Sequence, residues 1–331
     1  MAIIDLGIDM GSCNTTIYQQ GFGVVLKEPT AVAIRKERKA EVIASGTKAK
    51  RLLGKVSANT QVIFPVRDGV IINTEAATLL LKKFIARLLP EAVVKPRIRA
   101  LASIPCGLSL AERKAYETVM QKAGINEVTF IETPIAISRL VPDGGIFVIM
   151  GGGVTDVALV ANNEIIDGAS VNIAGEAINN AITDFLYEKQ NVKVGQATTE
   201  KIKLAIASLY ANDTSNIEVI GRDADTGGQR SFLITAKEVC DLIEPLLKKI
   251  TDMIAAMVTY APTDVAETMT ERGIYICGGS ATLPGLCEYI VNLTKLKVTL
   301  LDDAPSSVIT ALGMLVNERD KLAEFLKLSK I

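Results

Sequence analysis

The sequence predicts an α/β protein made of two related lobes that close on a phosphate-bearing ligand. Three stretches carry this prediction, because in each a β-branched apolar strand runs into a glycine-rich turn; they span residues 3–18, 146–160 and 273–283. Taken alone, 146–160 could equally be an ordinary hairpin with a flexible tip. Three such turns among alternating strands and helices instead favour two similar α/β lobes. Glycines leave room for a ligand, and consecutive N–H groups in such turns bind anions.

Composition narrows the class of protein. The 331 residues suffice for two hydrophobic cores, and 49% hydrophobic with 22% charged residues is typical of a globular protein. A net charge of −1 gives no basic field for nucleic acid, and the absence of histidine excludes histidine-based catalysis. The five scattered cysteines form no CxxC pair, which favours a reducing cytoplasm over a zinc site or a disulfide framework.

In their order and spacing, these motifs resemble the bacterial actin MreB family, within the superfamily of actin and heat-shock chaperone ATPases. The resemblance runs from Gly7 to about Val316 and includes residues 25–30, 65–71, 95–97, 131–134, 221–223 and 272–274. It implies an actin-like ATPase fold, with a large and a small subdomain in each lobe and the nucleotide in the cleft between the lobes. The implied subdomains are IA (1–31, 65–139 and 305–331), IB (32–64), IIA (140–178 and 243–304) and IIB (179–242).

The resemblance also implies a site for ATP or ADP with Mg²⁺, in which Asp9 holds the metal through water. The three turns would surround the phosphates and the base through Gly11, Ser12, Cys13 and Asn14; Gly151, Gly152, Gly153, Val154 and Thr155; and Gly278, Gly279, Ser280, Ala281 and Thr282. Gly175 and Glu176 begin a helix beside the second turn. Glu200, Lys201 and Lys203 match the adenosine end, although without the family they would read as exposed helical residues.

Two positions depart from the family pattern. Thr133 stands where the family places the glutamate that orients the attacking water, and Ile149 stands where it places an aspartate. Glu132 lies one place earlier, and Asp156 lies on the descending strand. Because such residues are often worth about two orders of magnitude in rate, we expect a nucleotide-binding filament protein with weak or lost hydrolysis. The alternative is an active polymerising ATPase with rearranged carboxylates. A chaperone or sugar kinase is a third class, but their extra substrate domain and sugar-pocket aspartate are not evident.

For partners, the resemblance implies head-to-tail protofilaments that serve cell shape, antiparallel pairing through a helix over 110–123, and association with other MreB paralogues. No apolar run reaches the roughly 18 residues of a membrane span, so contact with the inner face of the cell membrane would be peripheral. Val93 and Val94 would supply it, with the apolar stripe of Leu322, Phe325 and Leu326. Alternatively, Val93 and Val94 enter a strand over 98–104, and the stripe docks on the body of the protein.

Overall fold

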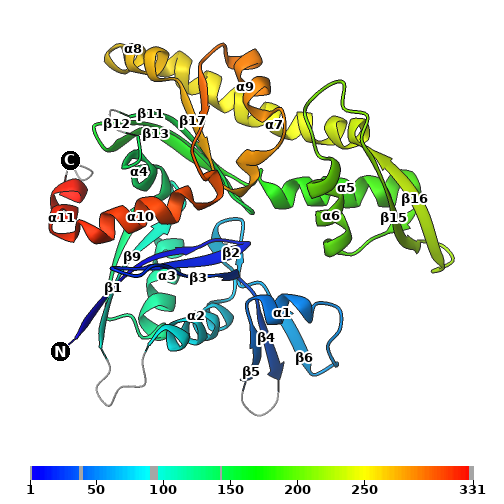
Figure 1. Ribbon diagram of the computed structural model, residues 1–331, viewed down its shortest axis with the longest axis horizontal. Coiled ribbons are helices and arrows are strands. Elements are labelled where there is room, and N and C mark those ends of the chain that lie inside the picture. Colours follow the sequence, from blue (N-terminus) through cyan, green and yellow to red (C-terminus); the bar gives the residue numbers. More distant parts are fainter. Residues whose placement is uncertain (1, 37–39, 90–95, 142–143, 328–331) are drawn as a thin grey trace.

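Two five-stranded sheets of the same topology form the centre of the molecule (Figure 1). The computed structural model describes residues 2–36, 40–89, 96–141 and 144–327, so Val93 and Val94 lie outside the described residues. The first sheet comprises β10 (Glu127–Glu132), β9 (Arg97–Ile104), β1 (Ile3–Met10), β2 (Asn14–Gln19) and β3 (Gly23–Pro29), in that order. The second comprises β13 (Glu164–Val171), β12 (Thr155–Ala161), β11 (Gly145–Met150), β17 (Ile274–Cys277) and β18 (Val298–Leu300).

Each sheet is built from the same two parts. A central strand, β1 or β11, forms an antiparallel hairpin with the next strand and a parallel pair with a strand from much later in its lobe. The hairpin turn in each sheet is one of the predicted glycine turns. The repeated topology confirms the prediction of two related lobes, which we call the first lobe (the β1 sheet) and the second lobe (the β11 sheet).

Helices cover both sheets and fill the space between them (Figure 1). In the first lobe, α2 (Thr74–Leu88) and α3 (Leu110–Ala123) pack on the sheet. In the second, the corresponding core includes α5 (Gly175–Gln190), α7 (Ala236–Tyr260), α8 (Thr263–Arg272) and α9 (Leu286–Thr294). Between the sheets lie α4 (Thr133–Ser138) and α10 (Ser307–Asn317), where Leu101, Phe147 and Leu312 share one buried cluster. Burial of this cluster fixes the two lobes against each other.

Each lobe also carries a small three-stranded sheet. In the first lobe it consists of β5 (Ala40–Ser45), β4 (Val32–Lys36) and β6 (Thr60–Ile63), with α1 (Thr47–Arg51) beside it. In the second it consists of β14 (Val192–Lys193), β15 (Asn216–Asp223) and β16 (Gln229–Thr235), with α6 (Gln196–Ile206) against it. A short hairpin of β7 (Val66–Arg67) and β8 (Val70–Ile71) precedes α2, and 3₁₀ turns occur at η1 (Gly279–Thr282) and η2 (Ala304–Ser306).

Local sequence signals determine the ends of α3. The Ser109 hydroxyl accepts a hydrogen bond from the Glu112 N–H, and the Glu112 carboxylate accepts one from the Ser109 N–H. Gly124 follows the helix in the left-handed conformation, at φ 103°. The two helix ends are therefore a capping box and a glycine stop, both formed by residues close together in the sequence.

Two residues of the C-terminal stripe dock on the body of the protein, while the Leu326 side chain lies outside the described part of the chain. Leu322, on α11 (Arg319–Lys327), is buried, and Phe325 packs against the cluster between the sheets. The Arg319 guanidinium lies 2.9 Å from the buried Asp5 carboxylate. For Leu322 and Phe325, the structure therefore shows the docked alternative rather than a free membrane-binding stripe. No helix among the described residues is long and apolar enough to cross a membrane.

Candidate functional site

The first two glycine turns have the same backbone geometry. In the turn between β1 and β2, the Gly11 N–H donates to the Asn14 carbonyl at 3.0 Å. In the turn between β11 and β12, the Gly151 N–H donates to the Val154 carbonyl at 2.9 Å. The central hairpin of each lobe thus has the same kind of turn, with backbone N–H groups at its tip.

These two turns face each other closely. A Cβ atom on Gly152 would clash with the Cys13 side chain, and one on Gly153 would lie 2.8 Å from Ser12 Cβ. The glycines therefore allow the turns to approach to a distance that any other residue would prevent. An anion placed here would meet main-chain donors from both lobes.

The third glycine turn and the start of α5 contact the second glycine turn. The Ser280 hydroxyl donates to the Gly151 carbonyl at 2.7 Å, and the Gly175 and Glu176 N–H groups donate to the carbonyls of Gly151 and Gly152. The other residues predicted for these turns are less central to this contact. Asn14, Gly279 and Thr282 are exposed, and Ala281 is buried in the core. The Thr155 hydroxyl donates to the Ile173 carbonyl.

Helix α6 brings two of its three predicted residues to the site. The Lys203 ammonium group donates to the Gly175 carbonyl at 3.1 Å, and burial lowers the pKa of Lys203. Three residues earlier, on the same face of the helix, the Glu200 carboxylate lies 3.1 Å from the ammonium group of Lys50 on α1. This ion pair links the two lobes. Lys201 is exposed, and the structure does not bring it to this group.

Asp9 is the second-last residue of β1, just before the first glycine turn. The Ser103 hydroxyl donates to Asp9 Oδ1 at 3.0 Å, while burial raises the pKa of Asp9 to about 6. A carboxylate oxygen is a ligand that Mg²⁺ prefers, and a nearby cation would favour its ionised form. Asp9 therefore fits a role beside Mg²⁺ held through water.

The two altered positions are both buried. The Thr133 hydroxyl donates to the Ile104 carbonyl at 2.9 Å, and Ile149 belongs to the apolar cluster between the sheets. Neither side chain is placed to polarise a water molecule.

A carboxylate nevertheless lies directly opposite Ile149. In the β11–β12 hairpin, Ile149 pairs with Asp156, so both side chains share one face of the sheet. Asp156 is buried, accepts a hydrogen bond from the Cys106 N–H at 3.0 Å and another from the Ser170 hydroxyl. Burial raises the pKa of Asp156 to about 6, and the nearby Glu132 and Asp9 carboxylates add to the shift.

Glu132 is held by the same loop as Asp156. Its carboxylate accepts a hydrogen bond from the Gly107 N–H at 2.9 Å, one residue after the Cys106 N–H that binds Asp156. The loop after β9 thus places Glu132 and Asp156 near each other, within electrostatic range of Asp9.

Sequence reasoning missed several members of the site. Lys50, Ser103, Cys106 and Ser170 are distant in the chain from their partners, and nothing local marks them. The turn Asp68–Gly69 was visible within the 65–71 motif, but no role was assigned to it. Its left-handed conformation, with φ 49° and 71°, is the type of turn that an Asp-Gly pair favours.

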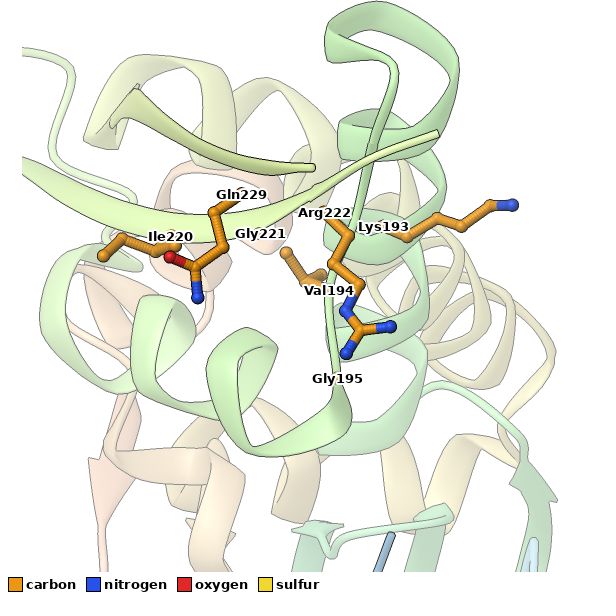
Figure 2. A pocket seen from close by; sticks show the side chains of 7 residues that line it. All are labelled: Lys193, Val194, Gly195, Ile220, Gly221, Arg222 and Gln229. Atoms are coloured by element: carbon orange, nitrogen blue, oxygen red, sulfur yellow. The ribbon is translucent and has the colours of Figure 1, made fainter. Parts of the chain in front are cut away.

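A separate cavity of about 420 Å³ lies in the small sheet of the second lobe (Figure 2). It is lined by Lys193, Val194, Gly195, Ile220, Gly221, Arg222 and Gln229, none of which was predicted for the nucleotide. The Lys193 side chain extends away from the other lining residues in Figure 2, and its ammonium group lies 5.6 Å from the centre of the Tyr187 ring.

The similarity to known proteins extends over nearly the whole chain. A family model described as "MreB/Mbl protein" matches residues 3–324. The cell shape-determining protein MreB of Escherichia coli (strain K12) is 34% identical over 309 residues, which cover 90% of this chain and 89% of the relative. The cell shape-determining protein Mbl of Bacillus subtilis (strain 168) is 29% identical, covering 96% and 97%.

Among solved structures, MreB 5 of Spiroplasma citri bound to AMPPNP superposes with a TM-score of 0.89 at 26% identity. The match covers 98% of this chain and 99% of that chain. The likeness therefore includes both lobes, both small sheets and the turns between them.

The raised pKa of Asp156 predicts a pH dependence of stability. Burial favours the protonated carboxyl in the folded protein. Protonation of Asp156 therefore stabilises the folded protein fully below pH 3.8, and this stabilisation is lost as the pH rises through about 6. Asp156→Asn removes this loss. We expect the free energy of unfolding of the variant, relative to wild type, to rise by roughly 2 kcal/mol between pH 4 and 7.

Denaturant unfolding at several pH values measures this difference. Asp184→Asn, at an exposed position on α5, is the control and should give a flat difference. A flat difference for Asp156→Asn as well would show that the carboxyl has the same pKa in the folded and the unfolded protein.

Proposed function

The chain belongs to the MreB/Mbl family of bacterial actins, and on that premise we propose that it is a cytoplasmic, nucleotide-binding subunit of a cell-shape filament. The observation that supports nucleotide binding is the close approach of two matching glycine turns, one from each lobe. The Spiroplasma citri relative, similar over the whole chain, is bound to AMPPNP.

In this proposal ATP or ADP lies between the two lobes. The turns 11–14 and 151–155 bind the phosphates through N–H groups that are not used within the turns, and Lys203, Glu200 and residues 278–282 surround the adenosine end. Mg²⁺, when bound, offsets phosphate charge. Asp9 would hold it through water, and the phosphates would supply other ligands, because no group of three or more His, Cys, Asp or Glu side chains in the described residues is placed to hold a metal.

We expect nucleotide binding to depend on the glycine turns. Isothermal titration calorimetry with Mg²⁺ should give a dissociation constant of micromolar or better for ATP. Gly152→Val should weaken binding at least tenfold, because its side chain would collide with Cys13 and force the turns apart. Gly228→Ala is the matched control, since a Cβ there meets nothing closer than 3.4 Å. Folded wild-type protein without saturable heat of binding would contradict the proposal.

Self-assembly is the second part of the proposal. We propose that the protein forms head-to-tail protofilaments that pair antiparallel through α3. Other MreB paralogues would be further partners. We also propose that each subunit has the four subdomains of the family. A contact between two different surfaces of the subunit does not close on itself and therefore gives a filament. Leu110, at the start of α3, is 89% exposed, so this helix offers an apolar side chain to a second protofilament.

Hydrolysis in this filament subunit is weak or lost. Two observations support this: Thr133 is buried with its hydroxyl bonded to a backbone carbonyl, and Ile149 is part of the core. Phosphoryl transfer depends on positioning the attacking water and on stabilising charge. With both positions unable to do so, nucleotide would be retained and turned over slowly.

Restoring a carboxylate at position 133 should raise turnover. We expect Thr133→Glu to increase phosphate release at least tenfold, because a carboxylate can orient and polarise the attacking water. Thr133→Gln has the same size but cannot act as a base, and it should leave the rate at the wild-type level. Calorimetry on both variants checks that each still binds ATP. An equal rate in the two variants would contradict the proposed role of position 133.

The alternative of an active ATPase with rearranged carboxylates rests on one specific observation: Asp156 is paired with Ile149 across the hairpin. If Asp156 or Glu132 activates the water, wild-type phosphate release is fast. Asp156→Asn or Glu132→Ala then reduces it, whereas Thr133→Gln does not.

We also propose a peripheral contact with the inner face of the cell membrane, through Val93 and Val94 rather than through the docked α11. Leu322→Ala should lower the free energy of unfolding by about 2–4 kcal/mol, because it removes a buried side chain. Co-sedimentation with anionic vesicles should be unchanged. Lys321→Ala, at an exposed neighbouring position, is the control. Loss of pelleting without loss of stability in Leu322→Ala would instead identify α11 as the membrane anchor.

A further inference from the structure

The turn Asp68–Gly69, between β7 and β8, lies against both glycine turns. The Gly69 N–H donates to Ser12 Oγ at 3.3 Å. A Cβ placed on Gly153 would come within 3.0 Å of the Asp68 nitrogen, and one on Gly69 within 3.0 Å of a Val154 methyl group. The turn is therefore packed against the first lobe's glycine turn on one side and the second lobe's on the other.

This turn has little freedom to adjust. Asp68 and Gly69 are both left-handed, with φ 49° and 71°, and a Cβ on Gly69 would also lie 2.8 Å from the Pro105 ring. Interiors packed at this density transmit small displacements instead of absorbing them. A shift of Ser12 or Val154 must move Gly69.

Tyr116, on α3, holds the other side of Gly69. Its phenol donates to the Gly69 carbonyl at 2.9 Å, and the side chain is 1% exposed. Burial raises the pKa of Tyr116, and the Asp9 and Asp156 carboxylates add to that shift, so the phenol stays protonated and remains a donor. If Gly69 moves, Tyr116 must follow or leave a buried carbonyl and a buried hydroxyl unpaired.

We propose that Tyr116 is a positioning residue that couples occupancy of the glycine turns to helix α3 through Gly69. The chain of contacts runs from Ser12 Oγ to the Gly69 N–H, and from the Gly69 carbonyl to the Tyr116 hydroxyl. Ser12 can accept from Gly69 and donate to a phosphate oxygen at the same time. The exposed Leu110 begins the same helix, so the coupling connects the nucleotide site to an outer surface of the first lobe.

This inference rests on the proposed nucleotide binding, and a double-mutant cycle separates the two. ATP affinity is measured by calorimetry for wild type, Ser12→Ala, Tyr116→Phe and the double variant. Tyr116→Phe should weaken ATP binding about fivefold, the order expected for one lost hydrogen bond. In the double variant the two losses should be clearly less than multiplicative, because both substitutions break the same chain.

Hydrogen exchange gives a readout that a merely structural role would not change. Below the concentration for assembly, adding ATP should slow amide exchange in α3 of wild type, and this response should be absent in Tyr116→Phe. Tyr187→Phe, at a half-exposed position on α5, is the control and should respond as wild type does.

The outcomes are distinct. Wild type that does not bind ATP overturns both the proposed function and this inference. ATP binding with multiplicative losses, or with an α3 response that persists in Tyr116→Phe, overturns the inference alone. If Tyr116→Phe fails to fold, the wild-type exchange experiment still decides, because α3 amides that ignore ATP exclude the coupling.

Discussion

The structure depends on two polypeptide turns that approach each other without side chains between them. Gly152 and Gly153 of the second lobe lie where any Cβ would meet Cys13 or Ser12 of the first. The two matching sheets place these turns next to each other. Helices α4 and α10, between the sheets, hold them at the separation that makes this contact possible. The third turn, α5 and Lys203 then bind to the backbone of the second turn and complete the group.

Features determined by local chemistry could be predicted from the sequence. The glycine turns and the caps of helix α3 depend on residues a few positions apart, so each signal lies within one short window. The repeated topology followed because the same strand–turn grammar occurs in both halves. Helix α6 begins after Gly195 without a side-chain cap, so no local signal marks its first residue.

Features determined by distant contacts could not. Lys50 and Glu200 are 150 residues apart, and Ser103 reaches Asp9 only because β9 pairs with β1. The position of Asp156 opposite Ile149 follows from hairpin register, which the sequence signals but does not fix until the turn length is known. Whether Leu322 faces solvent or the core depends on the shape of the surface beneath it, which no helical periodicity reveals.

The Lys50–Glu200 pair joins the small parts of the two lobes through side chains that are 48% and 40% exposed. Ions in solution screen a pair of that kind readily, over a Debye length of about 8 Å at physiological ionic strength. The buried layer between the sheets is insensitive to such screening. The contact between the two small subdomain sheets should therefore weaken as the salt concentration rises, while the packing of the two large sheets does not respond to salt.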